Sequence, residues 1–317
     1  MRLLLCLVVL IVCIACNPKD DHCAIVESVF CNNSLCNSAI SGEIDLAKRS
    51  VDCAFYSLKS TQVIKSLDRA NRLLSVRLIV QRSGFNRSYL RIAKPRRLMH
   101  NKFCVIDKRV VVTGSYNPSD LEKGDADGIV VIHSRDIAAK FAQEFEELWG
   151  GVYGRGQPSP QIETALAEQC IVAYFCPEDD CAQALLNEVE KAKHEIRFVY
   201  YSFTLGELAL ALVRLHSLGV AVNGIFEDSQ VSGYSQYWLL RHQGVDVCRA
   251  KHPAQVHHKF MVIDNTTLVI GSFNPTKSAQ LYNDENMVVI KDAEVARLFA
   301  KEFSKLNKVY CQKIYKQ

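Results

Sequence analysis

The chain has 317 residues, 49% of them hydrophobic, which suffices to bury a sizeable core in one large domain or two of ordinary size. Its net charge of +4 permits an anionic partner but is too small to require nucleic acid. The composition therefore predicts a globular protein, and the overall charge does not choose its substrate.

The N-terminus has the pattern of an export signal over residues 1–16. Arg2 precedes an apolar run from Leu3 to Ile14, which is shorter than the ~20 residues of a membrane-spanning helix. Ile14-Ala15-Cys16 is similar to the end of a bacterial lipoprotein box, in which Cys16 becomes lipidated. Lipidation of Cys16, ordinary cleavage and an uncleaved anchor remain open. Each predicts an exported protein, which is periplasmic, cell-surface or secreted.

Thirteen cysteines also favour an oxidising compartment. Four of them form two C-x4-C pairs: Cys31, Cys36, Cys176 and Cys181. Such pairs also occur as zinc thiolates, but in an exported protein we expect disulfides, either within each pair or between the pairs. Cys53 and Cys104 lie in apolar stretches, and we expect them to be inert core thiols.

The first elements alternate between strands and helices. Residues 24–30 predict a strand, and an amphipathic stretch then runs to about residue 50. Residues 51–57 predict a buried strand, residues 61–74 a helix and residues 76–80 another strand. This alternation predicts an α/β layered fold.

The second half repeats the order of the first. The first cysteine pair and Tyr56-Ser57 recur 145 residues later, whereas the histidine motifs described below are 157 apart, so the second half has gained twelve residues. Apolar stripes predict matching helices at residues 137–148 and 295–306. We therefore expect two duplicated α/β halves, residues 23–150 and 165–317, joined by a Gly- and Pro-rich linker at 151–164.

A His-x-Lys motif followed by Gly-Ser-x-Asn occurs once in each half. Read as a β-hairpin, the second copy places His257 and Lys259 on one face, beside Ser272 and Asn274 of the returning strand. His258 has the opposite parity and is expected to point into the packing. The first copy consists of His100, Lys102, Ser115 and Asn117 with identical spacing. Asp107 and Asp264 fall at the hairpin turns, where Asp is favoured, and are predicted to be structural.

Two such copies in a duplicated chain resemble the phospholipase D superfamily, whose HKD motif has this pattern. The resemblance covers nearly the whole chain after the signal segment and looks like two short nuclease-type units fused into one polypeptide. It implies two halves, each a mixed sheet flanked by helices, related by a pseudo-twofold axis around one shared active site. A monomer would then suffice for catalysis.

By this resemblance, one histidine forms a covalent phosphohistidine while the other protonates the leaving oxygen and then activates water. By analogy with two-motif relatives, the resemblance implies that His100 is the nucleophile. Two lysines and two asparagines would hold the phosphate: Lys102, Lys259, Asn117 and Asn274. Ser115 and Ser272 would support them, and Gly114 and Gly271 would let the backbone approach the phosphate.

Each histidine also needs a group on its other ring nitrogen to fix its tautomer. The resemblance implies an acid from the opposite half, which pairs His100 with Glu285 and His257 with Asp127. The first half reads Asp127-Gly128 where the family usually has Glu-Asn. No metal or cofactor is implied, because the lysines supply the positive charge, so activity is expected to survive EDTA.

The segment before the first motif is basic, with no acidic residue among Arg82, Arg87, Arg91, Lys94, Arg96 and Arg97. Phe85 and Tyr89 are interleaved with these residues, which favours single-stranded nucleic acid slightly, and therefore an endonuclease. A solvated loop or a patch on anionic lipid headgroups is the alternative, which would suit a phospholipase D or phosphatidyltransferase. A third class is a non-catalytic nucleic-acid- or membrane-binding protein, against which the two intact motifs argue.

Overall fold

A computed structural model describes residues 24–31, 34–120, 125–158, 171–252 and 254–311. The expected signal segment, with Cys16, and residues 159–164 of the expected linker lie outside these residues. The described part of the chain contains no helix that is both long and apolar enough to cross a membrane.

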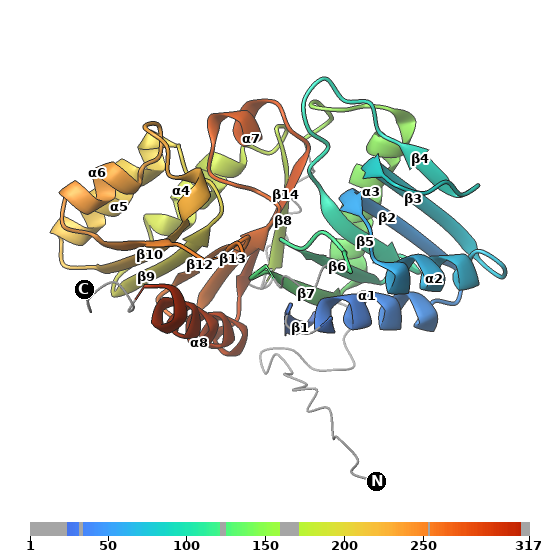
Figure 1. Ribbon diagram of the computed structural model, residues 1–317, viewed down its shortest axis with the longest axis horizontal. Coiled ribbons are helices and arrows are strands. Elements are labelled where there is room, and N and C mark those ends of the chain that lie inside the picture. The colour runs from blue at the N-terminus through green and yellow to red at the C-terminus, as the bar shows by residue number, and fades with distance from the viewer. Residues whose placement is uncertain (1–23, 32–33, 121–124, 159–170, 253, 312–317) are drawn as a thin grey trace, which may run out of the picture.

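Two seven-stranded mixed sheets stand side by side, the first drawn in blue to green and the second in yellow to red (Figure 1). The first sheet has the order β1-β7-β6-β5-β2-β3-β4 and the second the order β8-β14-β13-β12-β9-β10-β11. The strands of the first sheet are β1 (Ile25–Phe30), β2 (Ser50–Leu58), β3 (Ser75–Ser83), β4 (Leu90–Ile92), β5 (Lys102–Ile106), β6 (Val110–Gly114) and β7 (Gly128–His133). Those of the second are β8 (Ile171–Cys176), β9 (Glu195–Tyr200), β10 (Ala221–Glu227), β11 (Asp246–Ala250), β12 (Lys259–Ile263), β13 (Thr267–Gly271) and β14 (Glu285–Lys291). The identical order shows that the halves are duplicates.

The helices follow the same repeat. In the first half they are α1 (Leu35–Leu46), α2 (Thr61–Ala70) and α3 (Arg135–Gly150), and their counterparts in the second are α4 (Cys181–Val189), α5 (Gly206–Ser217) and α8 (Ala293–Tyr310). The second half adds a 3-10 turn η1 (Asp228–Gln230) and the short helices α6 (Tyr237–His242) and α7 (Lys277–Leu281). Residues 84–89 join β3 to β4 and residues 228–245 join β10 to β11, so eighteen minus six gives the twelve extra residues.

The predicted elements are found with small changes in their bounds. The strand at 51–57 is β2, and the helices at 137–148 and 295–306 extend into α3 and α8. Helix α2 ends four residues earlier than expected, because Leu73 and Leu74 both donate backbone hydrogen bonds to Ala70 in a tight turn. Leu73 is therefore exposed and does not extend the apolar face.

One hydrophobic core joins the halves. The ring of Phe141 in α3 lies 4.9 Å from Phe175 of β8, and Phe299 in α8 lies 4.9 Å from Phe30 of β1. Each long helix thus packs against a strand of the opposite half. Because aromatic rings bury large areas, this exchange holds the two sheets in a fixed relation.

Four disulfides occur in the described residues. Cys31–Cys36 and Cys176–Cys181 are bonded, as expected, within each C-x4-C pair. The prediction of free thiols at Cys53 and Cys104 was wrong, since these residues face each other across β2 and β5 and are bonded. Strand register, which sequence spacing alone does not fix, creates this pair. Cys248–Cys311, which was not predicted, links β11 to the residue after α8.

Candidate active site

Both His-x-Lys motifs lie where the two halves meet. Lys102 begins β5 and Lys259 begins β12, so each histidine lies two positions before the first residue of its strand. The backbone N–H of His100 donates to Asp284 of the second half at 2.9 Å, and that of His257 donates to Ala126 of the first half at 2.9 Å. Each histidine is therefore held by the other half.

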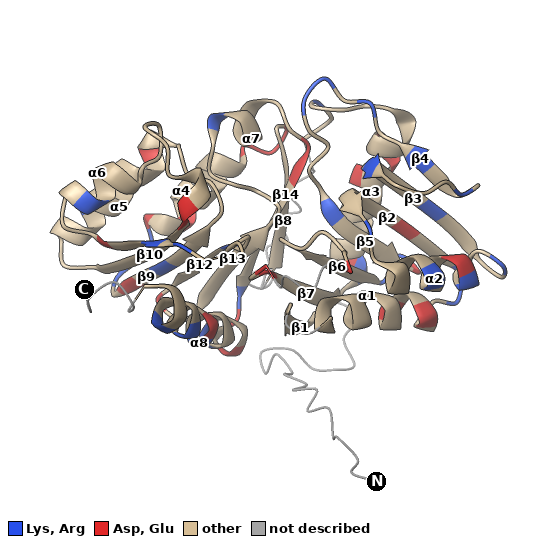
Figure 2. Ribbon diagram, viewed as in Figure 1, with Lys and Arg blue, Asp and Glu red and all other residues tan. Residues whose placement is uncertain are grey.

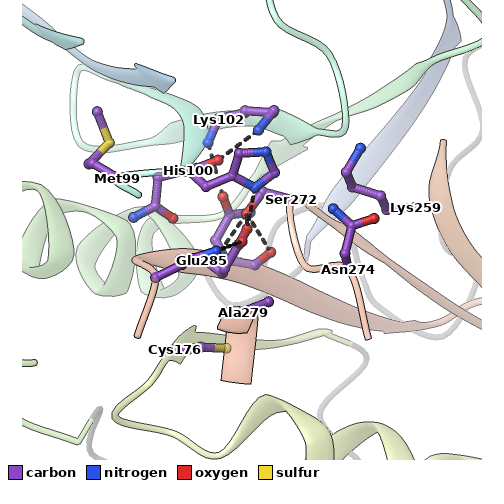
Figure 3. Close-up of polar contacts among 12 residues, drawn as sticks. Met99, His100, Lys102, Cys176, Lys259, Ser272, Asn274, Ala279 and Glu285 are labelled. Atoms are coloured by element: carbon purple, nitrogen blue, oxygen red, sulfur yellow. Dashed lines mark hydrogen bonds and ion pairs between the residues drawn. The ribbon is translucent and has the colours of Figure 1, made fainter. Parts of the chain in front are cut away.

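Each histidine is also paired with a buried carboxylate from the other half. His100 Nδ1 lies 2.7 Å from Glu285 Oε2, as Figure 3 shows, and His257 Nδ1 lies 2.9 Å from Asp127 Oδ1. These are the two pairings expected from the sequence. Because an ionised carboxylate only accepts, each Nδ1 carries the proton and each Nε2 keeps its lone pair.

The two acids have different surroundings. Glu285 also accepts from Ser272 Oγ at 2.6 Å and from Asn283 Nδ2 at 3.2 Å. Burial alone would raise the pKa of Glu285, but His100 and Lys102 outweigh it and lower that pKa. Likewise, burial opposes ionisation of Asp127, yet the charge and hydrogen bond of His257 lower its pKa to about 2. Both acids are ionised at neutral pH.

Both lysines are almost fully buried, with 1% of the side chain of each exposed. Lys102 Nζ donates to the carbonyl of His100, and Lys259 Nζ to that of His257, at 2.7 Å each. Lys259 Nζ also lies 3.0 Å from His257 Nε2. Burial lowers the pKa of Lys259 to about 8, and burial together with the charge of Lys259 lowers that of Lys102 well below its usual value.

Burial also lowers the pKa of both histidines, that of His100 to about 4. The charge of Lys259 contributes to this shift at His100, and the charge of Lys102 acts in the same direction on His257. Charges of opposite halves thus act on each other, so the two motifs form one electrostatic unit. An anion would be stabilised between them, because two buried ammonium groups repel one another.

The remaining motif residues Asn274, Asn117 and Ser115 differ from one another in their hydrogen-bond partners. Asn274 Oδ1 accepts from the backbone N–H of Ser202 at 3.0 Å, which leaves its Nδ2 for another acceptor, and Figure 3 shows Asn274 beside Lys259. The Oδ1 atom of Asn117 is buried and lacks a hydrogen-bond partner within the described residues. Ser115 exchanges hydrogen bonds with the backbone of Gly128, so this serine positions the strand of the acid.

The two motif glycines also meet a requirement of the fold that the sequence did not predict. A Cβ at Gly114 would overlap the carbonyl of Gly128, and a Cβ at Gly271 would overlap the carbonyl of Asn286. These glycines are needed because β6 and β13 approach β7 and β14 at these points, and the phosphate plays no part in that requirement.

Asp107 and Asp264 lie at the hairpin turns with φ values of 54° and 51°. Each carboxylate accepts three backbone N–H groups, from residues 48–50 and from residues 193–195 respectively. This geometry fits the structural role expected for them, since each aspartate ties its hairpin to the start of the neighbouring strand.

His258 points away from the site, as its parity predicts. Its ring is buried 5.1 Å from Phe260 and 6.5 Å from Phe30, and neither ring nitrogen has a partner within the described residues. A Cβ on Gly128 would come within 3.1 Å of His258 Cε1. His258 thus fills the space that a side chain at position 128 would need. This packing accounts for glycine at position 128, where the second half has Asn286.

The second half keeps the asparagine, and it joins the two halves. Asn286 Oδ1 accepts from the backbone N–H of Lys102 at 3.2 Å, and Nδ2 donates to Thr113 Oγ1 at 2.7 Å. Asn286 is fully buried. It thus fixes the start of the strand that carries Lys102, a role that sequence reasoning missed.

Two tyrosines were also missed as site residues. The Tyr56 ring lies 5.5 Å from that of His100, and the Tyr201 ring lies 5.0 Å from that of His257. Lys259 Nζ is 5.3 Å from the centre of the Tyr201 ring. The recurrence of Tyr-Ser at the end of the duplicated strand was the signal that could have identified them.

The basic segment divides into two groups. Arg87 is paired with Asp68, and the guanidinium of Arg91 covers Trp149 at 4.1 Å, so both side chains are engaged within the fold. Tyr89 is buried and donates to Asp68, so its ring is not available to a base. The other four basic side chains of the segment are exposed: Arg82, Lys94, Arg96 and Arg97.

No metal centre was expected here. Among the described residues, no group of three or more His, Cys, Asp or Glu side chains has the arrangement of a metal site.

The family described as "Cardiolipin synthase, PLD-like domain" matches residues 40–149 and 185–307, which is most of the chain. A human mitochondrial cardiolipin hydrolase is 33% identical over 123 residues, which cover 38% of this chain and 49% of that protein. A phospholipase D of Rickettsia conorii is 28% identical over 135 residues, or 42% of this chain and 68% of that one. The chain thus spans about half the length of the mitochondrial relatives that it matches.

Among solved structures, phosphatidylserine synthase of Haemophilus influenzae superposes with a TM-score of 0.68 at 13% identity. The superposition covers 90% of this chain and 86% of that one. At this identity the likeness concerns the fold alone.

Proposed function

Because this chain belongs to the phospholipase D-like family, we propose that it hydrolyses phosphodiester bonds through a covalent phosphohistidine, without a metal ion. The observation that carries the proposal is the meeting of two histidine–carboxylate pairs and two buried lysines, each pair assembled across the two halves. One chain then contains a complete site, so a monomer suffices.

In the first step, His100 Nε2 attacks phosphorus while the bond to the leaving alkoxide breaks. His257 Nε2 receives a proton from Lys259 Nζ, which lies 3.0 Å away, and gives a proton to the alkoxide. In the second step, His257 takes a proton from water, the resulting hydroxide attacks phosphorus, and the bond to His100 breaks. The proton then passes from His257 back to Lys259, so the products are an alcohol and a phosphomonoester, and both histidines return to their starting states.

The roles of the two histidines are supported by their surroundings. His100, with its pKa lowered to about 4, is a neutral imidazole at pH 7, which a nucleophile requires. Lys259 Nζ is 3.0 Å from His257 Nε2 and can supply the proton that His257 gives to the leaving group. Glu285 and Asp127 hold the two rings and stabilise the positive charge that each acquires.

The lysines and asparagines would bind the non-bridging oxygens of the phosphate. Two buried ammonium groups stabilise the added negative charge of the transition state more strongly than they would in water. Asn274 Oδ1 accepts from the backbone N–H of Ser202, and this bond fixes the orientation of the amide. Its Nδ2 can then donate to a phosphate oxygen. These groups replace the electrostatic contribution that a divalent cation makes in other phosphodiesterases.

The bond type can be tested separately from the natural substrate with bis(p-nitrophenyl) phosphate in EDTA. We expect turnover by the parent, a loss of at least ~10³-fold in His100→Asn and His257→Asn, and no loss in His242→Asn, which alters an exposed histidine. Loss of activity on chelation, or full activity of His100→Asn, would sink this mechanism. Binding of a phosphodiester without any turnover by the parent would instead favour a non-catalytic protein.

Two substrate classes have support. Exposed Arg82, Arg96 and Arg97 suit the backbone of a single-stranded nucleic acid, the class favoured by the sequence, although buried Tyr89 weakens the stacking part of that argument. Phospholipid is supported by the names of the relatives, a cardiolipin hydrolase and a phospholipase D. Incubation with single-stranded DNA, RNA, phosphatidylcholine and cardiolipin, beside His100→Asn, separates the two classes.

We also propose that the protein is exported. The support is the pattern of residues 1–16 together with four disulfides, which persist in an oxidising compartment. Fractionation of cells that produce the full chain would test this, and recovery of the protein in the cytosol with free thiols would contradict it.

A further inference from the structure

Three segments of the chain connect to the strand ends that carry the site, and Figure 1 shows two of them, the loop before β5 and α7, at the upper edge of the molecule, with α6 at the far left. They are residues 93–99, which lead into His100, residues 231–238 before and within α6, and residues 275–282, which include α7. Hydrogen bonds link the first and third segments to the site: Leu98 accepts from Asp284, and Pro275 accepts from Thr204, which follows the Tyr201-Ser202 strand end. The second segment is linked through Gln236, whose Nε2 donates to the carbonyl of Thr204. We call these three segments the rim.

The rim exposes large apolar side chains on both halves. Leu98 of the first half is 36% exposed, and Leu281 and Tyr282 of the second are 44% and 47% exposed. Tyr234 and Trp238 are exposed on the segment that the second half gained. Single exposed apolar residues are common on protein surfaces, but five of them in three segments around one site indicate a contact surface.

The rim is also positively charged. It contains Lys94, Arg96, Arg97 and Lys277 and no acidic residue. Figure 2 shows basic residues on the upper loop and on α7, and one exposed acid beside α7, Asp180, accepts from Gln280 Nε2. The guanidinium of Arg97 lies 5.4 Å above the ring of Tyr282, so basic and aromatic groups from opposite halves are adjacent.

This composition fits an anionic lipid surface. Tyr and Trp place an apolar ring in the membrane interface and a polar group in water, and nearby Lys and Arg are attracted to anionic headgroups. A single-stranded nucleic acid would use the same charges, but it does not require exposed leucines at positions 98 and 281. We propose that the rim docks on an anionic phospholipid membrane, so that a headgroup phosphodiester enters the site directly. The inference rests on the proposed function and assigns its substrate class.

Trp238 provides a probe within the rim. Brominated acyl chains quench tryptophan fluorescence only on contact. The quenching therefore reports docking of the rim itself and does not report attachment of the chain through its N-terminus. The protein is full-length His100→Asn, which leaves the lipid intact, and the vesicles contain brominated phosphatidylcholine with or without anionic phosphatidylglycerol. Trp238→Phe measures the contribution of Trp149, the second tryptophan of the chain.

We expect strong quenching on the anionic vesicles and at least tenfold weaker partitioning onto pure phosphatidylcholine. Arg96→Glu/Arg97→Glu and Leu281→Ser/Tyr282→Ser should each weaken partitioning onto the anionic vesicles at least tenfold. The matched control is Leu210→Ser/Leu218→Ser, which alters exposed leucines of the α5 region outside the rim and should change it less than twofold. Thermal melting checks that all variants are folded.

Absence of quenching in the parent, or equal loss in the control, would overturn the proposal. Binding of single-stranded DNA that depends on Arg96 and Arg97 but not on Leu281 and Tyr282, without vesicle binding, would assign the rim to nucleic acid instead. Failure of the proposed function has a different signature, in which vesicles quench Trp238 but the wild-type chain cleaves no phosphodiester.

Discussion

Replacing His258 with Leu should stabilise the protein, whereas the proposed mechanism requires His257 beside it for activity. The His258 ring is buried among aromatic side chains, and both of its nitrogens lack hydrogen-bond partners within the described residues. Such a buried, unsatisfied polar group costs ~1–3 kcal/mol, and Leu is of similar size but has no polar atom. At pH 7.5 we therefore expect a gain of about 1 kcal/mol or more.

The same burial makes stability depend on pH. Burial lowers the pKa of His258 to about 3, whereas in the unfolded chain it is near 6.5, so only the unfolded state binds the proton between these values. Stability is therefore lost as the pH falls from about 6.5 towards 3, and for one such group the loss at pH 5 is ~2 kcal/mol. His258→Leu should remove this contribution.

Urea denaturation at pH 7.5 and pH 5.0 measures both effects, with His242→Leu as the control because that ring remains in water in the folded chain. The difference in stability between the two pH values should shrink by ~2 kcal/mol in His258→Leu and hardly change in the control. A variant that is less stable at pH 7.5, or that keeps the parent's pH dependence, would refute the assignment of His258 to apolar packing.

Three further outcomes are expected. Because the pKa of Lys259 is lowered to about 8, kcat/KM for a soluble diester should fall as the pH rises above 8, by ~tenfold at pH 9, and a pH-rate profile that stays flat to pH 10 would contradict this. Glu285→Gln and Asp127→Asn should each lower kcat by ~10²–10⁴-fold while KM changes little, which steady-state kinetics will show. Burial raises the pKa of Asp284 to about 8, so between about pH 4 and pH 8 the folded chain keeps a proton on Asp284 that the unfolded chain has lost. The free energy of unfolding therefore falls as the pH rises through this range. Asp284→Asn should therefore be more stable than the parent at pH 8.5 in urea denaturation, and equal or lower stability would count against a protonated Asp284.

Much of the fold could be predicted because it is duplicated. Every strong signal occurs twice at matching positions, including the cysteine pair, the Tyr-Ser strand end, the His-x-Lys hairpin and the long apolar helix. The family resemblance implied the pairing of His100 with Glu285 across the halves, and the structure places these side chains 2.7 Å apart.

The features that could not be predicted are of two kinds. Some lie where the two halves differ in sequence, and others depend on how neighbouring strands are aligned. Cys53 and Cys104 become partners only because β2 and β5 align them opposite one another. His258 and Gly128 replace an asparagine-based contact with apolar packing, and neither residue alone indicates this exchange. The basic segment was predicted as one surface, whereas Asp68 and Trp149 engage part of it within the fold.

The central claim is that two half-sites from one chain form a single centre that passes through a phosphohistidine. The most direct test is to quench turnover of a soluble phosphodiester within the first seconds at alkaline pH, which preserves phosphohistidine, and to map the modified peptide by mass spectrometry. We predict a phosphoryl adduct on His100 that accumulates when Asp127→Asn slows its hydrolysis and is absent from His100→Asn. An adduct on His257, or turnover with no adduct on either histidine, would contradict the account.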